Sequence, residues 1–158
     1  MLENLKKLEA EGKVGGSDYF KPQNGNNIIR VLTEGIHNVN KFGNARFVMF
    51  IIDRKDAKVK PYFAPYTVYK AIANLEEDPF FKFQGMPIPY DVNLKVEGAG
   101  TKDVEYSVTA SPNKTELTPD EIAAAREKGS IAVYVAGLDK QDDSKGQEAP
   151  PIGDNDAR

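Results

Sequence analysis

Residues 47–63 read FVMFIIDRKDAKVKPYF, and this stretch decides the fold. Its first six residues are all apolar, which predicts a strand buried on both faces. Residues 53–56 then supply polar turn chemistry. Residues 58–63 alternate, and successive strand side chains point to opposite faces. The stretch therefore predicts a hairpin whose second strand places Lys58, Lys60 and Tyr62 on one face and Val59, Pro61 and Phe63 on the other.

These residues alone leave two interpretations of the hairpin open. Two cations and an aromatic ring on one face are typical of a surface that follows a phosphate backbone and stacks bases. Lysines on an ordinary solvated hairpin also protect a sheet edge from pairing with other chains. The rest of the chain has to distinguish the two.

Composition narrows the classes of function. The chain has 158 residues, enough for one domain that buries a core without disulfides. It has no cysteine, which excludes disulfides, thiolate zinc sites and cysteine nucleophiles. Its single histidine, His37, has no second ligand pattern nearby, and no Gly-rich phosphate loop precedes a helix. We therefore expect neither an enzyme nor a metal or cofactor. The lack of a membrane-length apolar run or a signal peptide predicts a soluble, intracellular protein, and the lack of cysteine suits a reducing cytoplasm.

Charge is distributed unevenly, although the net charge is only −3. Residues 21–70 contain nine Lys and Arg against three Asp and Glu. Residues 71–138 contain six against eleven, and residues 139–158 three against six. Seven of the fifteen Phe and Tyr residues also lie between positions 42 and 69. A basic, aromatic segment followed by acidic ones indicates a polyanion as partner.

Hydrophobic periodicity and turn residues predict a mainly β protein with minor α content. The predicted order in its body, β-β-β-α-β-β, is that of a five-stranded OB-fold barrel, whose ligand face lies on the second and third strands. We divide the chain into an N-terminal arm (1–16), an OB-fold domain (17–138) and a disordered acidic tail (139–158). The predicted elements are a helix over 2–10, strands over 28–32, 46–53 and 58–63, a helix over 65–77, strands over 90–97 and 104–110, a helix over 118–128 that starts with a capping box, and an extra strand over 131–136, with loops over 35–43 and 78–89.

The basic segment supplies the candidate DNA-binding residues. Its cations would neutralise phosphates, and its rings would stack on bases. Tyr62, on the lysine face, is the leading stacking candidate, whereas at least one of Phe47 and Phe50 is expected in the core. The candidate cations are Lys21, Arg30, Lys41, Arg46, Arg54, Lys55, Lys58, Lys60 and Lys70, and the candidate rings are Phe42, Phe47, Tyr62, Tyr66 and Tyr69.

The run YFKPQNGNNIIRVL, residues 19–32, resembles the entry strand of phage-type single-stranded DNA-binding proteins, where a Lys-Pro, Gly, Asn, Ile-Arg-(Val/Ile)-Leu pattern recurs. Further stretches are similar to the same family in the same order, and the resemblance covers roughly residues 17–125. These stretches are Asp53-Arg54, Val59-Lys60, residues 66–72, residues 90–92, the turn at 98–100, residues 106–108 and the helix start at 117–119.

The resemblance implies an OB-fold that coats and protects single-stranded DNA during replication, recombination and repair in a phage-infected or bacterial cell, with self-association on DNA as a further expectation. Two features depart from the family. The T-even relatives hold a structural zinc through Cys and His, which this chain cannot do without cysteine, and many such proteins end in Phe, whereas this chain ends at Arg158. The resemblance also implies that replication and recombination proteins bind the acidic tail through Asp139, Asp142, Asp143, Glu148, Asp154 and Asp156.

Other functions stay open from the residues alone. The basic face could dock an acidic protein, or the OB-fold could bind RNA, because no residue pattern here reads a 2′-hydroxyl. The tail could compete with DNA for the basic groove, or it could serve only as a solubilising end.

Overall fold

The computed structural model describes residues 19–145, with side chains for residues 19–138. The expected helix over 2–10 and tail residues 146–158 lie outside the described residues. The described part is mainly β, with a six-stranded antiparallel sheet, and none of its helices is long and apolar enough to cross a bilayer. Its elements are β1 (Gly25–Val31), β2 (Ile36–Val39), β3 (Ala45–Asp53), β4 (Lys58–Ala64), α2 (Tyr66–Asn74), the short 3-10 helix η1 (Leu75–Glu77), β5 (Tyr90–Glu97), β6 (Glu105–Lys114), α3 (Pro119–Lys128) and α4 (Ile131–Lys145).

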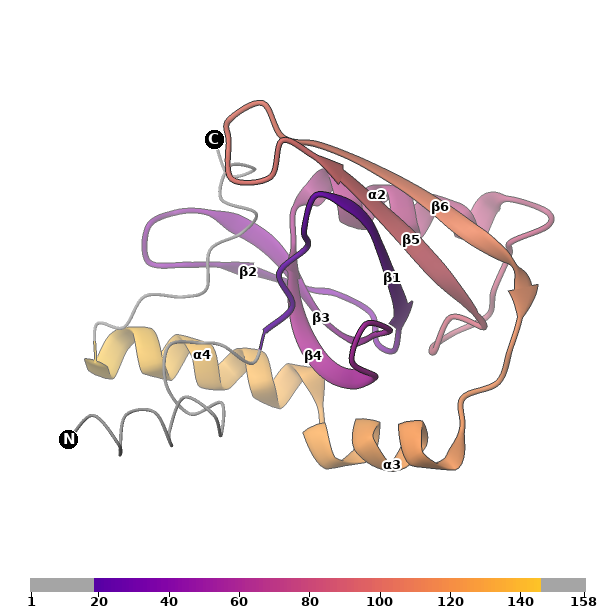
Figure 1. The fold of residues 1–158 in the computed structure, drawn as a ribbon. Coiled ribbons are helices and arrows are strands. Elements are labelled where there is room, and N and C mark those ends of the chain that lie inside the picture. Colours follow the sequence, from indigo (N-terminus) through magenta and orange to yellow (C-terminus); the bar gives the residue numbers. More distant parts are fainter. Residues whose placement is uncertain (1–18, 146–158) are drawn as a thin grey trace, which may run out of the picture.

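Strand β1 lies at the centre of the sheet, between β3 and β5 (Figure 1). Strand β3 is long enough to pair with two strands along one of its edges. Its second half pairs with β1, with Asp53 opposite Ile29, and its first half pairs with β2, with Val48 opposite Ile36. The hairpins β3–β4 and β5–β6 complete the sheet. Strands β2 and β3 therefore form a hairpin that extends beyond the β1 pairing.

The inner face of the curved sheet holds the main core. Met49 and Ile51 of β3 pack there with Leu94 of β5, and α2 covers them through Val68 and Ile72. Strand β5 alternates as its sequence predicts, because Tyr90, Val92, Leu94 and Val96 are all buried while the residues between them reach solvent. The alternation expected from period-two patterning is confirmed.

The outer face of β3 and β4 is covered by the C-terminal helices. Val48 and Phe63 pack with Val135 and Leu138 of α4. Phe50 packs beside them with residues of α3 and α4. Figure 1 shows both helices below the sheet, whereas α2 lies behind it. Strand β3 is thus buried on both faces, as its six-residue apolar run predicts.

Two predicted elements were wrong. Residues 131–136, expected as a strand, begin α4, which continues to Lys145 through the start of the segment expected to be disordered. Alternating β-branched residues are typical of a strand, but the apolar residues at 131, 134, 135 and 138 also have the i, i+3, i+4, i+7 spacing of one helix face. That face packs on β3 and β4. Residues 36–39, expected as loop, form β2, because the first half of β3 has a free edge to pair with.

The predicted capping box of α3 is confirmed. The Thr118 hydroxyl accepts a hydrogen bond from the Glu121 N–H at 3.2 Å, and the Glu121 carboxylate accepts one from the Thr118 N–H at 2.9 Å. Pro119 occupies the first helical turn, where its missing N–H costs nothing. These contacts begin the helix at the residue that the sequence indicates.

Candidate nucleic-acid interface

The β2–β3 hairpin has one covered face and one open face. Asn38 and Arg46 are buried on the face that α4 covers. His37 and Phe47 are opposite each other in register and lie on the open face, with ring centroids 5.3 Å apart. His37 is exposed and Phe47 half-buried. The hairpin therefore presents rings to solvent where β3 leaves the core.

Helix α2 adds a second aromatic layer. The Tyr69 ring stacks on Phe47 with centroids 4.5 Å apart and planes within 7° of parallel. Its hydroxyl oxygen accepts a hydrogen bond from the Gly35 N–H at 3.0 Å. A Cβ on Gly35 would lie 2.5 Å from the Tyr69 ring, so only glycine permits this approach. Tyr69 is held between the chain before β2 and the ring of Phe47.

Tyr66, one helical turn earlier, is 59% exposed. Its ring lies 6.3 Å from Phe47, and the Lys70 ammonium lies 5.8 Å from its centroid. A cation near a ring face adds attraction and leaves the other ring face for a base. Tyr66 and Lys70 thus place an open ring and a charge side by side.

Phe42 projects from the hairpin tip and is 61% exposed. The tip is a preformed turn, because the Asn40 side-chain oxygen accepts hydrogen bonds from the N–H groups of Phe42 and Asn44, both at 2.9 Å. Gly43 supplies the positive φ of +84° that the turn needs. The Lys41 ammonium lies 5.4 Å from the Phe42 ring centroid. Because the turn already holds the Phe42 ring exposed to solvent, little conformational entropy of the protein would be lost when a ligand binds this ring.

These residues lie on the β2–β3 hairpin and on α2, and together we call them the aromatic patch. Beside it, a cavity of about 530 Å³ lies between the start of α2 and the start of β6, lined partly by Tyr66, Glu105 and Tyr106. The Glu105 carboxylate would repel a phosphate but accept hydrogen bonds from a base amino group. The aromatic patch consists of His37, Phe42, Phe47, Tyr66 and Tyr69, with Lys41 and Lys70.

The expected single groove does not include all the predicted cations. Arg30 is 1% exposed, and its guanidinium donates to Asp91 and to Thr115. Arg46 is fully buried, donates to Asn38 at 2.9 Å and lies 4.9 Å from the Phe63 ring centroid. Both arginines therefore stabilise the fold from inside it, and neither lies on a ligand surface. An arginine within an apolar strand needs a partner, and here the protein provides it.

Arg54 and Lys60 are half-buried in ion pairs. Arg54 binds both Asp91 and Glu121, which ties β3 to α3. Burial acts to lower the pKa of Arg54, but its hydrogen bond with Glu121 and the charge of Asp91 outweigh burial and raise that pKa. The Lys60 ammonium binds Asp53 at 2.9 Å and Asp56 at 2.7 Å. Burial acts to lower the pKa of Lys60, but the two carboxylates outweigh burial and raise that pKa. The charges of Arg54 and Lys60 are therefore largely neutralised by carboxylates of the protein itself.

The five remaining predicted cations lie in three places. Lys41 and Lys70 belong to the aromatic patch. Lys55 and Lys58 are exposed at the β3–β4 turn, at the opposite end of β3, roughly 25 Å away at strand spacing. Lys21 is exposed with its ammonium 4.9 Å from the Tyr19 ring centroid. Two of the nine candidate cations and four of the five candidate rings thus lie on the β2–β3 hairpin and α2.

Tyr62, the leading candidate from the sequence, was expected on the surface, and that placement is wrong. It is 2% exposed and packs edge-on against Phe20, with centroids 5.0 Å apart. Tyr62 does follow Lys58 and Lys60 on one face of β4, but this face turns from solvent into the core along the strand. Alternation identifies which residues share a face and not where that face becomes buried.

Sequence reasoning also missed His37 as part of the surface. It was placed in a solvated loop, and only the pairing of β2 with β3 brings it opposite Phe47. The turn residues Asn40 and Gly43 are the sequence signal that residues 40–44 connect the two strands of a hairpin. Among the described residues, no group of three or more His, Asp or Glu is placed to hold a metal ion.

Comparison with known proteins yields no match: no family model, no curated protein and no solved structure is significantly similar to this chain.

Proposed function

We propose that this protein is an OB-fold that binds single-stranded DNA with little sequence preference through the aromatic patch. The observation that carries the proposal is the exposure of Phe42 and Tyr66 beside Lys41 and Lys70 on a preformed surface. Such a surface suits unpaired bases, since every base has a π-face and the cations meet the backbone.

The strand pairings support the OB-fold. Strand β1 pairs with both β3 and β5, the hairpins β3–β4 and β5–β6 follow, and α2 stands between β4 and β5. This order agrees with the five strands and the helix of an OB-fold, with β2 as an addition in the first connection. The usual ligand face, on β3 and β4, is covered here by α3 and α4. The open face of the β2–β3 hairpin is the aromatic surface that these helices leave free.

The patch has a specific energetic signature. Stacking contributes roughly 1–3 kcal/mol per base. If Lys41 and Lys70 are its two phosphate contacts, the logarithm of affinity should fall with the logarithm of salt with a slope of about −1.4, since each contact on a single strand contributes about 0.7. A groove of nine cations would show a slope several times steeper. Aromatic stacking therefore supplies most of the affinity at moderate salt.

The proposal is tested by fluorescence anisotropy of labelled oligo-dT and of a matching duplex over a salt series. We expect single-strand binding with little duplex binding. The double variant Phe42→Ala, Tyr66→Ala should weaken binding by at least about 30-fold, the loss of some 2 kcal/mol. Lys70→Ala should reduce the salt slope by about 0.7.

Lys55→Ala is the matched control, because it removes an exposed lysine at the far end of β3 and should change the affinity by less than about twofold. Equal effects of the Lys55 and Lys70 variants would contradict the placement of the site. Absence of single-strand binding at low salt would refute the function itself. An RNA strand of the same length separates DNA from RNA binding.

In the cell we propose that this binding coats and protects single strands during replication, recombination and repair, with no catalytic step. Docking of partner enzymes on the acidic tail is part of the same proposal. Deleting residues 146–158, which lie outside the described part of the chain, should leave oligonucleotide affinity unchanged or tighten it, because that segment carries a net negative charge.

A further inference from the structure

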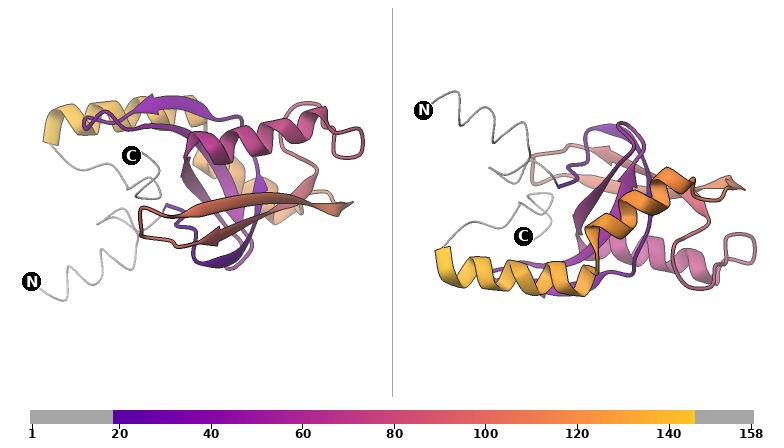
Figure 2. Two further views of the ribbon diagram at one scale, coloured as in Figure 1. Left: turned by 90° about the horizontal axis from the view of Figure 1, so that it is seen from above. Right: turned by 90° about the horizontal axis from the view of Figure 1, so that it is seen from below.

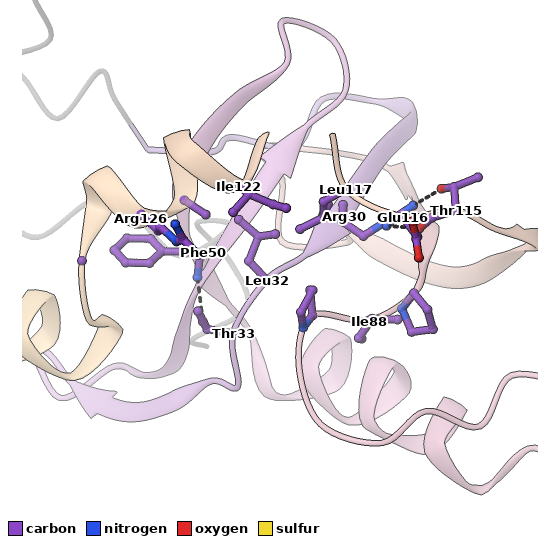
Figure 3. A pocket seen from close by; sticks show the side chains of 14 residues that line it. Arg30, Leu32, Thr33, Phe50, Ile88, Thr115, Glu116, Leu117, Ile122 and Arg126 are labelled. Carbon is purple, nitrogen blue, oxygen red and sulfur yellow. Dashed lines mark hydrogen bonds between the residues drawn. The ribbon is translucent and has the colours of Figure 1, made fainter. Parts of the chain in front are cut away.

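A second cavity shares no lining residue with the aromatic patch and has no role in the proposed function. It holds about 800 Å³ and lies between α3 and the strand β1 (Figure 3). In this view Leu32 and Phe50 lie between Ile122 of α3 above and Ile88 below. We call this cavity the α3 slot. Its volume is within the range of sites that take a small molecule or a cluster of side chains.

The two ends of the α3 slot differ in charge. Arg126 lies near Phe50 at one end, and Glu116 lies near Thr115 at the other (Figure 3). Arg126 is exposed, and exposed Glu127 and Lys128 follow it at the end of α3, where two cations therefore stand against one carboxylate. Arg30 also borders the slot, but its guanidinium is held by Asp91 and Thr115. The occupant that fits is apolar, with negative charge at the Arg126 end.

A surface of this description exists on the protein itself. After α2 the chain reads Glu76-Glu77-Asp78-Pro79-Phe80, with all five residues exposed and Phe80 at 56%. We call these five residues the Phe80 knob. Three acidic residues therefore precede an exposed aromatic residue in the chain, with one proline between them.

The Phe80 knob is ordered and not a loose loop. The Asp78 carboxylate accepts hydrogen bonds from the N–H groups of Phe80 at 2.8 Å and Phe81 at 3.3 Å. The Phe80 ring meets Phe81 edge-on at 4.8 Å, and Phe81 in turn packs on buried Tyr90 at 5.5 Å. This chain of contacts holds the Phe80 side chain in an outward position. Little conformational entropy would therefore be lost when a partner binds it.

We propose that the Phe80 knob of one copy inserts into the α3 slot of a second copy. Phe80 and Pro79 fill the apolar slot, and Glu76 and Glu77 approach Arg126 and Lys128 of the other copy. Figure 2 shows the turn after α2 projecting from the opposite end of the molecule to the outer end of α4, with α3 between them. Because knob and slot are different surfaces, the contact is head-to-tail: the copy that inserts its knob keeps a free slot, and the copy whose slot is filled keeps a free knob, so further copies can add at both ends.

This inference goes beyond the proposed function, and its test needs no nucleic acid. Its consequence for a DNA-coating protein is cooperativity, since neighbours on one strand would contact each other directly. Failure of DNA binding would leave the assembly intact, and failure of assembly would leave binding by a single copy intact.

The test is sedimentation equilibrium of the full chain over a concentration series, without DNA. The wild-type protein should associate reversibly beyond a dimer. Phe80→Ala should lower the association constant by about 30-fold, as expected for truncation of a central aromatic anchor. Glu116→Gln is the control, because Glu116 lies at the other end of the slot and should have little effect. A wild-type protein that stays monomeric at all concentrations, or a Phe80 variant that associates like the wild type, overturns the proposal.

Charge exchange tests the pairing without disturbing the core. Arg126→Glu and Glu77→Arg should each weaken self-association, since each removes one attraction and adds a repulsion. An equimolar mixture of the two variants should associate more strongly than either alone, because the reversed slot of one then meets the reversed knob of the other. A mixture that behaves as the average of its components would refute the knob-and-slot contact.

Discussion

Replacing Gly35 with alanine should disrupt the aromatic patch through its supporting layer. The new Cβ would lie 2.5 Å from Cε1 and 2.9 Å from Cζ of Tyr69, so the ring has to move. Moving it breaks the hydrogen bond from the Gly35 N–H to the Tyr69 hydroxyl and the stack on Phe47. The first contributes about 1 kcal/mol and the second about 0.5–1.5 kcal/mol.

Alanine also reduces the entropy of the unfolded chain, which offsets about 0.4–1 kcal/mol. The net expectation for Gly35→Ala is a loss of about 1 kcal/mol in the free energy of unfolding. Urea denaturation followed by tyrosine fluorescence and circular dichroism measures it. Tyr69→Phe, which removes only the hydroxyl, should lose the hydrogen-bond part alone.

Gly137→Ala is the matched control. Gly137 lies in α4, and a Cβ there would meet nothing within 4 Å. The same substitution should therefore stabilise the protein by up to about 1 kcal/mol, because alanine is the better helix former. A Gly35 variant as stable as the wild type, or two variants that change stability with the same sign, would refute the role of Gly35. The Gly35 variant should also bind oligo-dT more weakly than the Gly137 variant, if Tyr69 supports the patch.

Two further predictions concern pH. Burial acts to raise the pKa of Glu121, but hydrogen bonds from Thr118 and Arg54 outweigh it and lower that pKa below its usual 4.5. The difference in the free energy of unfolding between the wild type and Glu121→Gln should therefore be constant near neutral pH and decrease as the pH falls below about 4.5. Urea denaturation of both proteins over this pH range measures it. A difference that increases in acid would contradict the lowered pKa. Burial, with the negative charge of Asp78, raises the pKa of Tyr90 to about 12. Unfolding lets this phenol ionise near pH 10, so stability should fall between about pH 10 and 12, and less steeply in Tyr90→Phe; equal slopes over this interval would disprove the shift.

Local patterns in the sequence were sufficient for elements whose neighbours agree with them. The alternation from Tyr90 to Glu97 predicted β5 because one face of that strand is buried and the other solvated along its length. The capping box at Thr118 predicted the start of α3 because its hydrogen bonds join residues only three apart. The apolar run at the start of β3 indicated burial on both faces without saying what covers the second face.

Long-range packing decided the rest. Residues 131–136 fit a strand and a helix by themselves, and as a helix they place the apolar side chains at 131, 134 and 135 against the apolar face of β3 and β4. Candidate cations were chosen from local charge, but Arg30 and Arg54 find Asp91 more than thirty residues away in the sequence.

The sequence by itself determined that this protein is mainly β, with a basic aromatic segment ahead of acidic ones. Only the tertiary structure decided which rings reach solvent. Tyr62 becomes core because β4 turns inward, whereas Tyr66 stays open because α2 begins outside the main core. Exposure depends on contacts between residues distant in the chain, and local patterns contain no information about those contacts.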